Sequence, residues 1–233
     1  MTRILALDAA TQACSVALKI DDQIEERFEV ASRSHAQRLL PMIEALLSEA
    51  GIAMASLDCI AFGRGPGSFT GLRIAAGVVQ GLAFGADLPV APVSTLQTIA
   101  QSAVGSSDYE RALVVLNAHM GEIYWANYEI SSTNAQLVGE EMLSGSHQLS
   151  LPYAEQLLPG MPAVLGLGSG WELRDSFPAT LVNSMVKIDS QRLPHACDML
   201  PFAQMQLEQE SLVAAEFALP VYLREKNAWR KSV

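Results

Sequence analysis

A glycine-rich loop between an apolar run and a helical pattern constrains this fold more than any other stretch of the sequence. The apolar residues 57–63 predict a buried strand, the loop spans residues 64–71, and a helix is expected from there to about residue 85. Glycine permits backbone N–H groups to approach a ligand or another chain closely. A buried strand that turns directly into a helix indicates an α/β domain.

Three short β-rich runs precede this loop. Residues 4–8, 14–20 and 24–30 predict strands, and Asp21 and Asp22 mark a tight turn between the second and the third. Strands joined by such short turns form an antiparallel meander.

A helical pattern links the meander to the strand before the loop. Apolar residues recur at helical spacing between Ser34, the expected N-cap, and Gly51, which favours the left-handed geometry of a helix end. A short strand at 89–93 and a helix from Ser94 follow the loop and its helix. The predicted order is β-β-β-α-β-α-β-α.

The second half of the chain gives weaker signals. Residues 131–150 are polar and rich in turn formers, whereas 162–167 predict a strand, 198–209 a helix and 220–223 a last strand.

The start of the chain has an echo in its middle. The apolar run 4–9 leads into the strand 14–20, and the run 113–118, which begins 109 residues later, leads into a strand at 123–128. A duplicated domain explains the echo, although any strand–turn–strand unit resembles it. The length of 233 residues fits one large domain or two of about 110 residues.

Composition excludes several classes of protein. Half of the residues are hydrophobic and 17% are charged, which excludes a disordered chain, a collagen and a coiled coil. The sequence has 15 Lys and Arg against 25 Asp and Glu, a net charge of −10, which disfavours binding to nucleic acid through a broad basic surface. If the function involves nucleic acid, we expect another protein to hold it.

Cysteine usage and hydropathy indicate the compartment. Cys14, Cys59 and Cys197 are scattered, with no CxxC pair and no disulfide framework, which indicates a reducing environment. The apolar run at residues 4–7 is too short for a signal peptide, and the longest uncharged stretch, 88–107, is interrupted by prolines. We expect a cytoplasmic protein without a membrane partner.

The loop and Asp8 are the candidates for a ligand site. No Gly-Lys-Ser/Thr follows the loop, so it is not a Walker A motif, and Arg73 is a weak substitute for the missing lysine. Asp8 ends the first strand, where a carboxylate holds a magnesium-bound water, orients a phosphate or accepts a turn hydrogen bond. A tight turn with Thr70 as the helix cap explains the loop equally well. The candidate nucleotide or loop site comprises Asp8, Gly65, Gly67, Ser68 and Arg73.

The residues that carry metal-dependent or covalent catalysis lack the required patterns. The four histidines, His35, His119, His147 and His195, form no HxxxH or HExxH pair, and the sequence has no GxSxG motif and no Cys–His signature. We therefore predict no metal site and no catalytic residue.

The helix after the loop carries glycines on one face. Gly77, Gly81 and Gly85 recur every four residues, and each costs about 1 kcal/mol relative to alanine in a helix interior. A neighbouring backbone packed on this face would offset the cost. The spacing does not distinguish another helix of the same chain from a partner subunit.

Three segments resemble the TsaB family, also called YeaZ. They are residues 4–8 (ILALD), the loop 64–73 (RGPGSFTGLR) and residues 220–224 (PVYLR). That family provides the non-catalytic subunit of the bacterial machinery that makes threonylcarbamoyladenosine in tRNA. The resemblance implies two α/β domains of the actin-like ATPase (ASKHA, RNase H-like) type: residues 1–104 with about 198–233, and a degenerate second domain at 105–197.

The resemblance also implies that the chain works through partners. The catalytic paralogue, TsaD, has a His-x-x-x-His metal pair where Thr95 and Ile99 stand here, and neither of these side chains is a useful ligand for iron or zinc. The chain is thus expected to be no enzyme and to have no cofactor of its own, with ATP and metal on the partner subunits. The expected partners are TsaD in a heterodimer, TsaE in a ternary complex and a second copy in a homodimer, with tRNA contacted only indirectly.

The same resemblance assigns the partner surface to the first two helices. The expected interface residues are Leu39, Leu40, Ile43, Leu46, Leu47, Thr70, Gly77 and Gly81. An interface here would supply the backbone neighbour that the glycine face requires.

The chain departs from the family at Asn117-Ala118-His119, where many relatives have Asp-Ala-Arg. The missing carboxylate argues against nucleotide binding by the second predicted hairpin, which comprises the runs 113–118 and 123–128. Two other functions stay open: an independent actin-fold ATPase or small-molecule kinase that uses Asp8 and the glycine-rich loop, and a peptidase. The basic residues near the C-terminus are expected to form a solvated tail rather than an RNA contact: Arg224, Lys226, Arg230 and Lys231.

Overall fold

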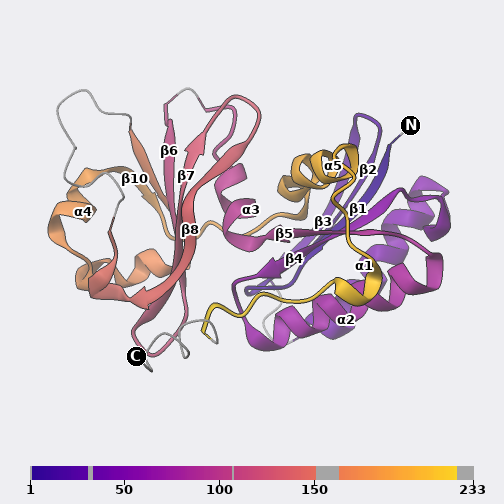
Figure 1. Ribbon diagram of the computed structural model, residues 1–233, viewed down its shortest axis with the longest axis horizontal. Helices are drawn as coiled ribbons and strands as arrows, with labels where there is room; N and C mark the ends of the chain where they lie inside the picture. The colour runs from indigo at the N-terminus through magenta and orange to yellow at the C-terminus, as the bar shows by residue number, and fades with distance from the viewer. Residues whose placement is uncertain (1, 31–33, 107, 151–162, 225–233) are drawn as a thin grey trace. The chain divides into compact units, whose positions relative to one another are not determined.

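The chain folds into two compact units, shown in Figure 1 as a computed structural model that describes residues 2–30, 34–106, 108–150 and 163–224. The first unit groups Met1–Thr98 with Pro194–Val221, and the second groups Ile99–Leu193 with Tyr222–Val233. The sequence placed the C-terminal segment in the first unit. The residues directly after Val221 group with the second unit instead, and the Arg224 side chain there contacts Glu122 and Ala118 of that unit.

The first unit is built on a five-stranded sheet. Its strands are β1 (Arg3–Asp8), β2 (Ala13–Ile20), β3 (Gln23–Val30), β4 (Cys59–Gly65) and β5 (Val90–Ser94). The order across the sheet is β3-β2-β1-β4-β5, with β1, β2 and β3 antiparallel and with β4 and β5 parallel to β1. The predicted meander and both later strands are confirmed, each within two residues of its expected bounds.

Two long helices cover one face of this sheet (Figure 1). They are α1 (His35–Ala50) and α2 (Phe69–Ala86), and α1 ends at Gly51 in the predicted left-handed conformation, with φ of 65°. Their apolar sides share one core with β1, β2 and β4. The helix α5 (Leu200–Glu208) covers the opposite face, where it packs on β1, β4 and β5.

The second unit repeats the same strand order. Its strands are β6 (Arg111–Asn117), β7 (Glu122–Ile130), β8 (Ala135–Gly145), β9 (Val164–Leu167) and β10 (Met185–Asp189), arranged as β10-β9-β6-β7-β8. As in the first sheet, an antiparallel meander, β6-β7-β8, is extended by parallel strands on the other side of its first strand. The echo in the sequence is therefore a repeated topology, and the two expected α/β domains of the same type are confirmed.

The helices that follow β5 and β9 are shorter than α1 and α2. The strand β5 leads into α3 (Thr95–Gln101), and β9 leads into the 3-10 segment Ser169–Ser176 and the short α4 (Ala179–Ser184). Further 3-10 turns lie at Met54–Ser56, Ser146–Gln148, Ala196–Met199 and Ala215–Phe217.

A buried tryptophan organises the core of the second unit. The Trp171 side chain has no solvent exposure, and its Nε1–H donates to the carbonyl of Leu113 at 3.2 Å. A Cβ on Gly166 would lie 2.7 Å from the indole ring of Trp171. The glycines that precede Trp171 in the sequence thus make room for its ring and for the neighbouring strand.

Three expectations from the sequence were wrong or incomplete. Residues 131–150 were expected to be mainly turns, but most of them form the edge strand β8. The strand β10 was not predicted. Residues 220–223 form no strand; Val221 N–H instead donates to the carbonyl of Arg64 at 2.8 Å. The last helix, expected at 198–209, is confirmed as α5 with the 3-10 turn before it.

Within the described residues, α2 is long and apolar enough to cross a membrane by length and composition alone. In this structure its apolar residues Leu72, Ala75 and Val79 are buried against the sheet, as in the core helix of many water-soluble domains.

Candidate functional site

The glycine-rich loop packs against the β1–β2 hairpin of its own unit. A Cβ on Gly67 would lie 2.2 Å from the carbonyl oxygen of Ala10, and one on Gly71 would lie 1.9 Å from that of Ala9. Ser68 N–H donates to the Ala10 carbonyl at 2.7 Å. The close approach that glycine permits is therefore used by the chain's own backbone.

Asp8 lies beneath this loop and is fully buried. Its Oδ1 accepts from Ala10 N–H at 2.8 Å, and its Oδ2 accepts from the Thr95 hydroxyl at 3.1 Å. A Cβ on Gly63 would lie 1.8 Å from Asp8 Oδ2, so only glycine fits there. Burial raises the pKa of Asp8 to about 6, and the two hydrogen bonds act against that rise.

The other candidates for a nucleotide or loop site are placed by the start of α2. Ser68, not Thr70, is the N-cap of that helix, and its hydroxyl accepts from Gly71 N–H at 3.3 Å. Gly65 has a φ of 96°, and a Cβ on it would lie 2.9 Å from Leu72. The Arg73 guanidinium lies over the Phe69 ring, 3.8 Å from its centroid.

The structure thus brings Asp8, Gly67 and Ser68 together with the hairpin, while Gly65 and Arg73 pack on neighbours along α2. The Ser68 N–H, a donor of the kind that a phosphate requires, donates instead to the Ala10 carbonyl, and Gly67 and Gly71 pack against the carbonyls of Ala10 and Ala9.

Most of the predicted interface residues on α1 belong to the core. Leu39, Ile43 and Leu46 are at most 1% exposed and pack against the sheet, so a partner cannot reach them without opening the unit. This corrects their assignment to a surface. Leu47 is partly buried against the same core, whereas Leu40 is 42% exposed.

The expected interface on α2, in contrast, lies at the surface. Thr70, Gly77 and Gly81 are exposed, and no described atom of the chain lies within 4 Å of a Cβ built on either glycine. Two large apolar residues of the same helix, Phe69 and Phe84, are 53% and 83% exposed. No described helix of this chain therefore packs on the glycine face. We call Phe69, Thr70, Arg73, Gly77, Gly81 and Phe84 the α2 face.

Neither residue at the positions of the paralogue's two metal-binding histidines has a metal-ligating side chain. Thr95 and Ile99 are fully buried, and the Thr95 hydroxyl is engaged with Asp8.

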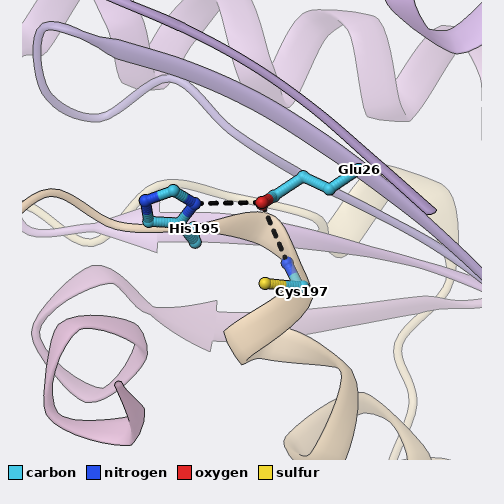
Figure 2. A group of neighbouring side chains, drawn as sticks. All are labelled: Glu26, His195 and Cys197. Atoms are coloured by element: carbon cyan, nitrogen blue, oxygen red, sulfur yellow. Dashed lines mark hydrogen bonds and ion pairs between the residues drawn. The ribbon is translucent and has the colours of Figure 1, made fainter. Parts of the chain in front are cut away.

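One cluster of potential metal ligands was not predicted from the sequence. Figure 2 shows Glu26 of β3 beside His195 and Cys197 of the segment that leads into α5. His195 Nδ1 lies 3.0 Å from Glu26 Oε2, and Cys197 N–H donates to Glu26 Oε1 at 3.3 Å. One ligand atom from each side chain lies within 4.8 Å of the other two. The short spacing of His195 and Cys197 was the only local signal, because Glu26 is 169 residues away from His195.

The β6–β7 hairpin, which we call the second hairpin, repeats the turn of the β1–β2 hairpin but has no carboxylate there. Asn117 Oδ1 accepts from His119 N–H at 2.8 Å, as Asp8 Oδ1 accepts from Ala10 N–H. The Arg224 side chain contacts this hairpin: its guanidinium lies 2.5 Å from Glu122 Oε2 and donates to the Ala118 carbonyl at 3.0 Å. Arg224 is therefore not part of a solvated tail. Lys226, Arg230 and Lys231 lie outside the described residues.

Comparison with known proteins identifies the family. The family model described as TsaD, tRNA N6-adenosine threonylcarbamoyltransferase, matches residues 27–231. The tRNA threonylcarbamoyladenosine biosynthesis protein TsaB of Escherichia coli K12 is 42% identical over 230 residues, which cover 98% of this chain and 97% of that protein. TsaB of Haemophilus influenzae is 34% identical, with 98% and 96% coverage.

A solved structure agrees with these sequence matches. YeaZ from Pseudomonas aeruginosa superposes with a TM-score of 0.87 at 43% identity, over 96% of this chain and all of that chain. Because identity, coverage and fold agree from end to end, the chain belongs to the TsaB (YeaZ) family, a branch of the TsaD family.

Proposed function

We propose that the chain is a non-catalytic subunit that supports TsaD in the transfer of a threonylcarbamoyl group to adenosine in tRNAs that read codons starting with A. The observation that carries this proposal is the internal use of the glycine-rich loop. Gly67 and Gly71 meet the carbonyls of Ala10 and Ala9, and the Asp8 carboxylate accepts two hydrogen bonds from its own unit. These contacts within the first unit support a role other than nucleotide binding.

The thiols support the absence of covalent chemistry. Burial is the main cause that raises the pKa of Cys14 to about 11 and the pKa of Cys59 and Cys197 to about 12. A thiol with such a pKa is a poor nucleophile at neutral pH, because the thiolate is the reactive form. A peptidase mechanism through cysteine therefore finds no support among these residues.

The α2 face is the surface that we assign to TsaD and, in its absence, to a second copy of this chain. Exposed phenylalanines, and glycines on whose Cβ positions no described residue packs, are features of a surface that packs closely against another backbone. TsaE would complete a ternary complex, and the ATP and metal that the transfer reaction uses would be bound by the partner subunits. The net charge of −10 agrees with a subunit that leaves tRNA to TsaD. The complex would work in the cytoplasm.

Reconstitution tests the proposed role directly. TsaD, TsaE and a threonylcarbamoyl-adenylate synthase are incubated with tRNA, with and without this chain, and modified adenosine is measured. We expect product only when the chain is present. Full yield without it contradicts the proposal, and ATP turnover by the purified chain alone would favour the ATPase or kinase alternative.

A substitution on the α2 face tests the surface. Gly81→Leu adds a bulky side chain where the structure has open space, so the unit should stay folded. We expect pairing with TsaD and self-association to weaken more than tenfold, which is about 1.4 kcal/mol. Gln204→Leu on α5 is the matched control, since it places the same side chain on another helix. Equal affinities of the two variants for TsaD would show that the surface lies elsewhere.

A further inference from the structure

The cluster of Glu26, His195 and Cys197 joins two segments that are far apart in the chain. Glu26 lies on β3, whereas His195 and Cys197 lie where the chain returns to the first unit after the second (Figure 2). The side chains of His195 and Glu26 are 34% and 20% exposed, so solvent reaches the group. An ion can therefore enter without unfolding of the unit.

The donor set is the one that zinc prefers. A carboxylate oxygen, an imidazole nitrogen and a thiol sulfur are the three ligand types of protein zinc sites, whereas calcium and magnesium prefer oxygen ligands alone. Around a tetrahedral zinc these ligand atoms lie roughly 3.3–3.6 Å apart, given the usual bond lengths. His195 Nδ1 and Glu26 Oε2 are already 3.0 Å apart, and the full set spans at most 4.8 Å. Small side-chain rotations therefore suffice to close the site.

Groups around the cluster hold the ligands in place. The Ser15 hydroxyl donates to Glu26 Oε1 at 2.7 Å and accepts from Ala196 N–H at 2.9 Å. The Phe28 ring stacks on the imidazole of His195, with centroids 4.1 Å apart and an interplanar angle of 11°. Such outer contacts orient ligands in metal sites, and their removal commonly lowers metal affinity 10- to 100-fold.

The local charges favour a cation. The carboxylates of Asp198 and Glu26 lie close to the Cys197 sulfur. Two carboxylates beside the sulfur attract a divalent cation. A zinc ion with one carboxylate and one thiolate is neutral overall, which suits a half-buried position.

We propose that Glu26, His195 and Cys197 bind one Zn²⁺, with water in the fourth position, and that this ion fastens the returning segment to β3. On binding, the Cys197 thiol releases one proton to solvent and its sulfur bonds to zinc. His195 binds through Nδ1 with its ring proton on Nε2, so the hydrogen bond between Nδ1 and Glu26 Oε2 is replaced by two bonds to the ion. This fastening role is independent of the scaffold function proposed above.

The test uses the full-length chain, purified and freed of metal with a chelator. Zinc is titrated in competition with a chromogenic chelator, and cobalt is added separately because a cobalt–thiolate bond gives a charge-transfer absorption band. We expect one zinc ion per chain and, with cobalt, a thiolate band. Cys197→Ser should abolish the band and weaken zinc binding more than about 100-fold, beyond the effect of an outer contact.

Control variants distinguish a metal site from a cluster that is held together by hydrogen bonds alone. In a cluster without metal, Cys197 contributes its backbone N–H, which Cys197→Ser retains. His195→Gln is a second variant that removes a ligand, and His147→Gln is the matched control at an exposed histidine. Absence of stoichiometric zinc binding, or binding that is unchanged in both Cys197→Ser and His195→Gln, overturns the proposal. Neither result affects the reconstitution assay, so the two proposals fail separately.

Discussion

The hairpins that begin the two sheets have the same turn but different surroundings. In each, a short side chain at the end of the first strand accepts a hydrogen bond from the N–H two residues on: Asp8 from Ala10 and Asn117 from His119, both at 2.8 Å. The strands that follow are arranged in the same order in both sheets. The repeated sequence pattern therefore specifies the strands and the turn.

The segment after the parallel strand makes the difference. After β4, the glycine-rich loop lies on the first hairpin, and Ala9 and Ala10 are buried beneath it. After β9, the glycines approach Val115 within strand β6 instead. The second hairpin thus leaves His119 and Met120 exposed, both with positive φ. One strand order supports two different sites, because the loops that follow the strands decide what is covered.

The covered hairpin gives the largest expected effect. Gly71→Ala places a Cβ 1.9 Å from the Ala9 carbonyl, and two backbone segments must move apart to accept it. We expect the free energy of unfolding of the first unit to fall by more than about 3 kcal/mol. Chemical denaturation followed by circular dichroism measures the change.

Gly77→Ala is the matched control on the same helix. Among the residues that the structure describes, no atom lies within 4 Å of its new Cβ, so the variant should gain about 0.5–1 kcal/mol of stability from higher helix propensity. If the two alanine variants are equally stable, the loop does not press on the hairpin as described.

The buried carboxylate provides the second contrast between the hairpins. Asp8 has a pKa near 6 when folded, above its ordinary value of 3.8, so the folded state holds its proton more tightly than the unfolded state. The stability that this provides is complete below about pH 4 and is lost as the pH rises to about 6. At 1.36 kcal/mol per pKa unit, the loss is about 3 kcal/mol.

Asp8→Asn removes this pH dependence while it keeps the oxygen that accepts from Ala10 N–H. The difference in unfolding free energy between the variant and the original chain should therefore grow between pH 4 and pH 6, in favour of the variant. Asn117→Asp, at a half-buried position of the second hairpin, is the control and should show little of this slope. Parallel pH profiles for the original chain and Asp8→Asn would mean that Asp8 is not buried as a carboxyl.

Much of the fold follows from local patterns in the sequence. The strands of the first sheet and the helices α1 and α2 lie close to their predicted bounds, because alternating or helical apolar spacing is a local property. The strand β8 was not predicted because it is an edge strand with few buried positions, so its sequence resembles a polar turn region.

The candidate sites were harder to predict, because they depend on what covers each surface. The apolar stripe of α1 predicted a buried face correctly, but spacing does not reveal whether the sheet or a partner buries it, and here the sheet covers Leu39, Ile43 and Leu46. The cluster of Glu26 with His195 and Cys197 depends on the return of the chain to the first unit, a long-range contact that no local motif encodes.

The smallest expected effect concerns the second hairpin, which is held by a side chain rather than covered by a glycine loop. Arg224→Met keeps the apolar stem of the side chain but removes its ion pair with Glu122 and its hydrogen bond to the Ala118 carbonyl. Because the Arg224 side chain is 48% exposed, we expect a loss of about 0.5–1 kcal/mol in unfolding free energy. Glu122→Gln and the double variant complete a cycle that isolates the ion pair. The coupling energy should shrink as salt is added, whereas zero coupling at low salt would mean that Arg224 belongs to a solvated tail after all.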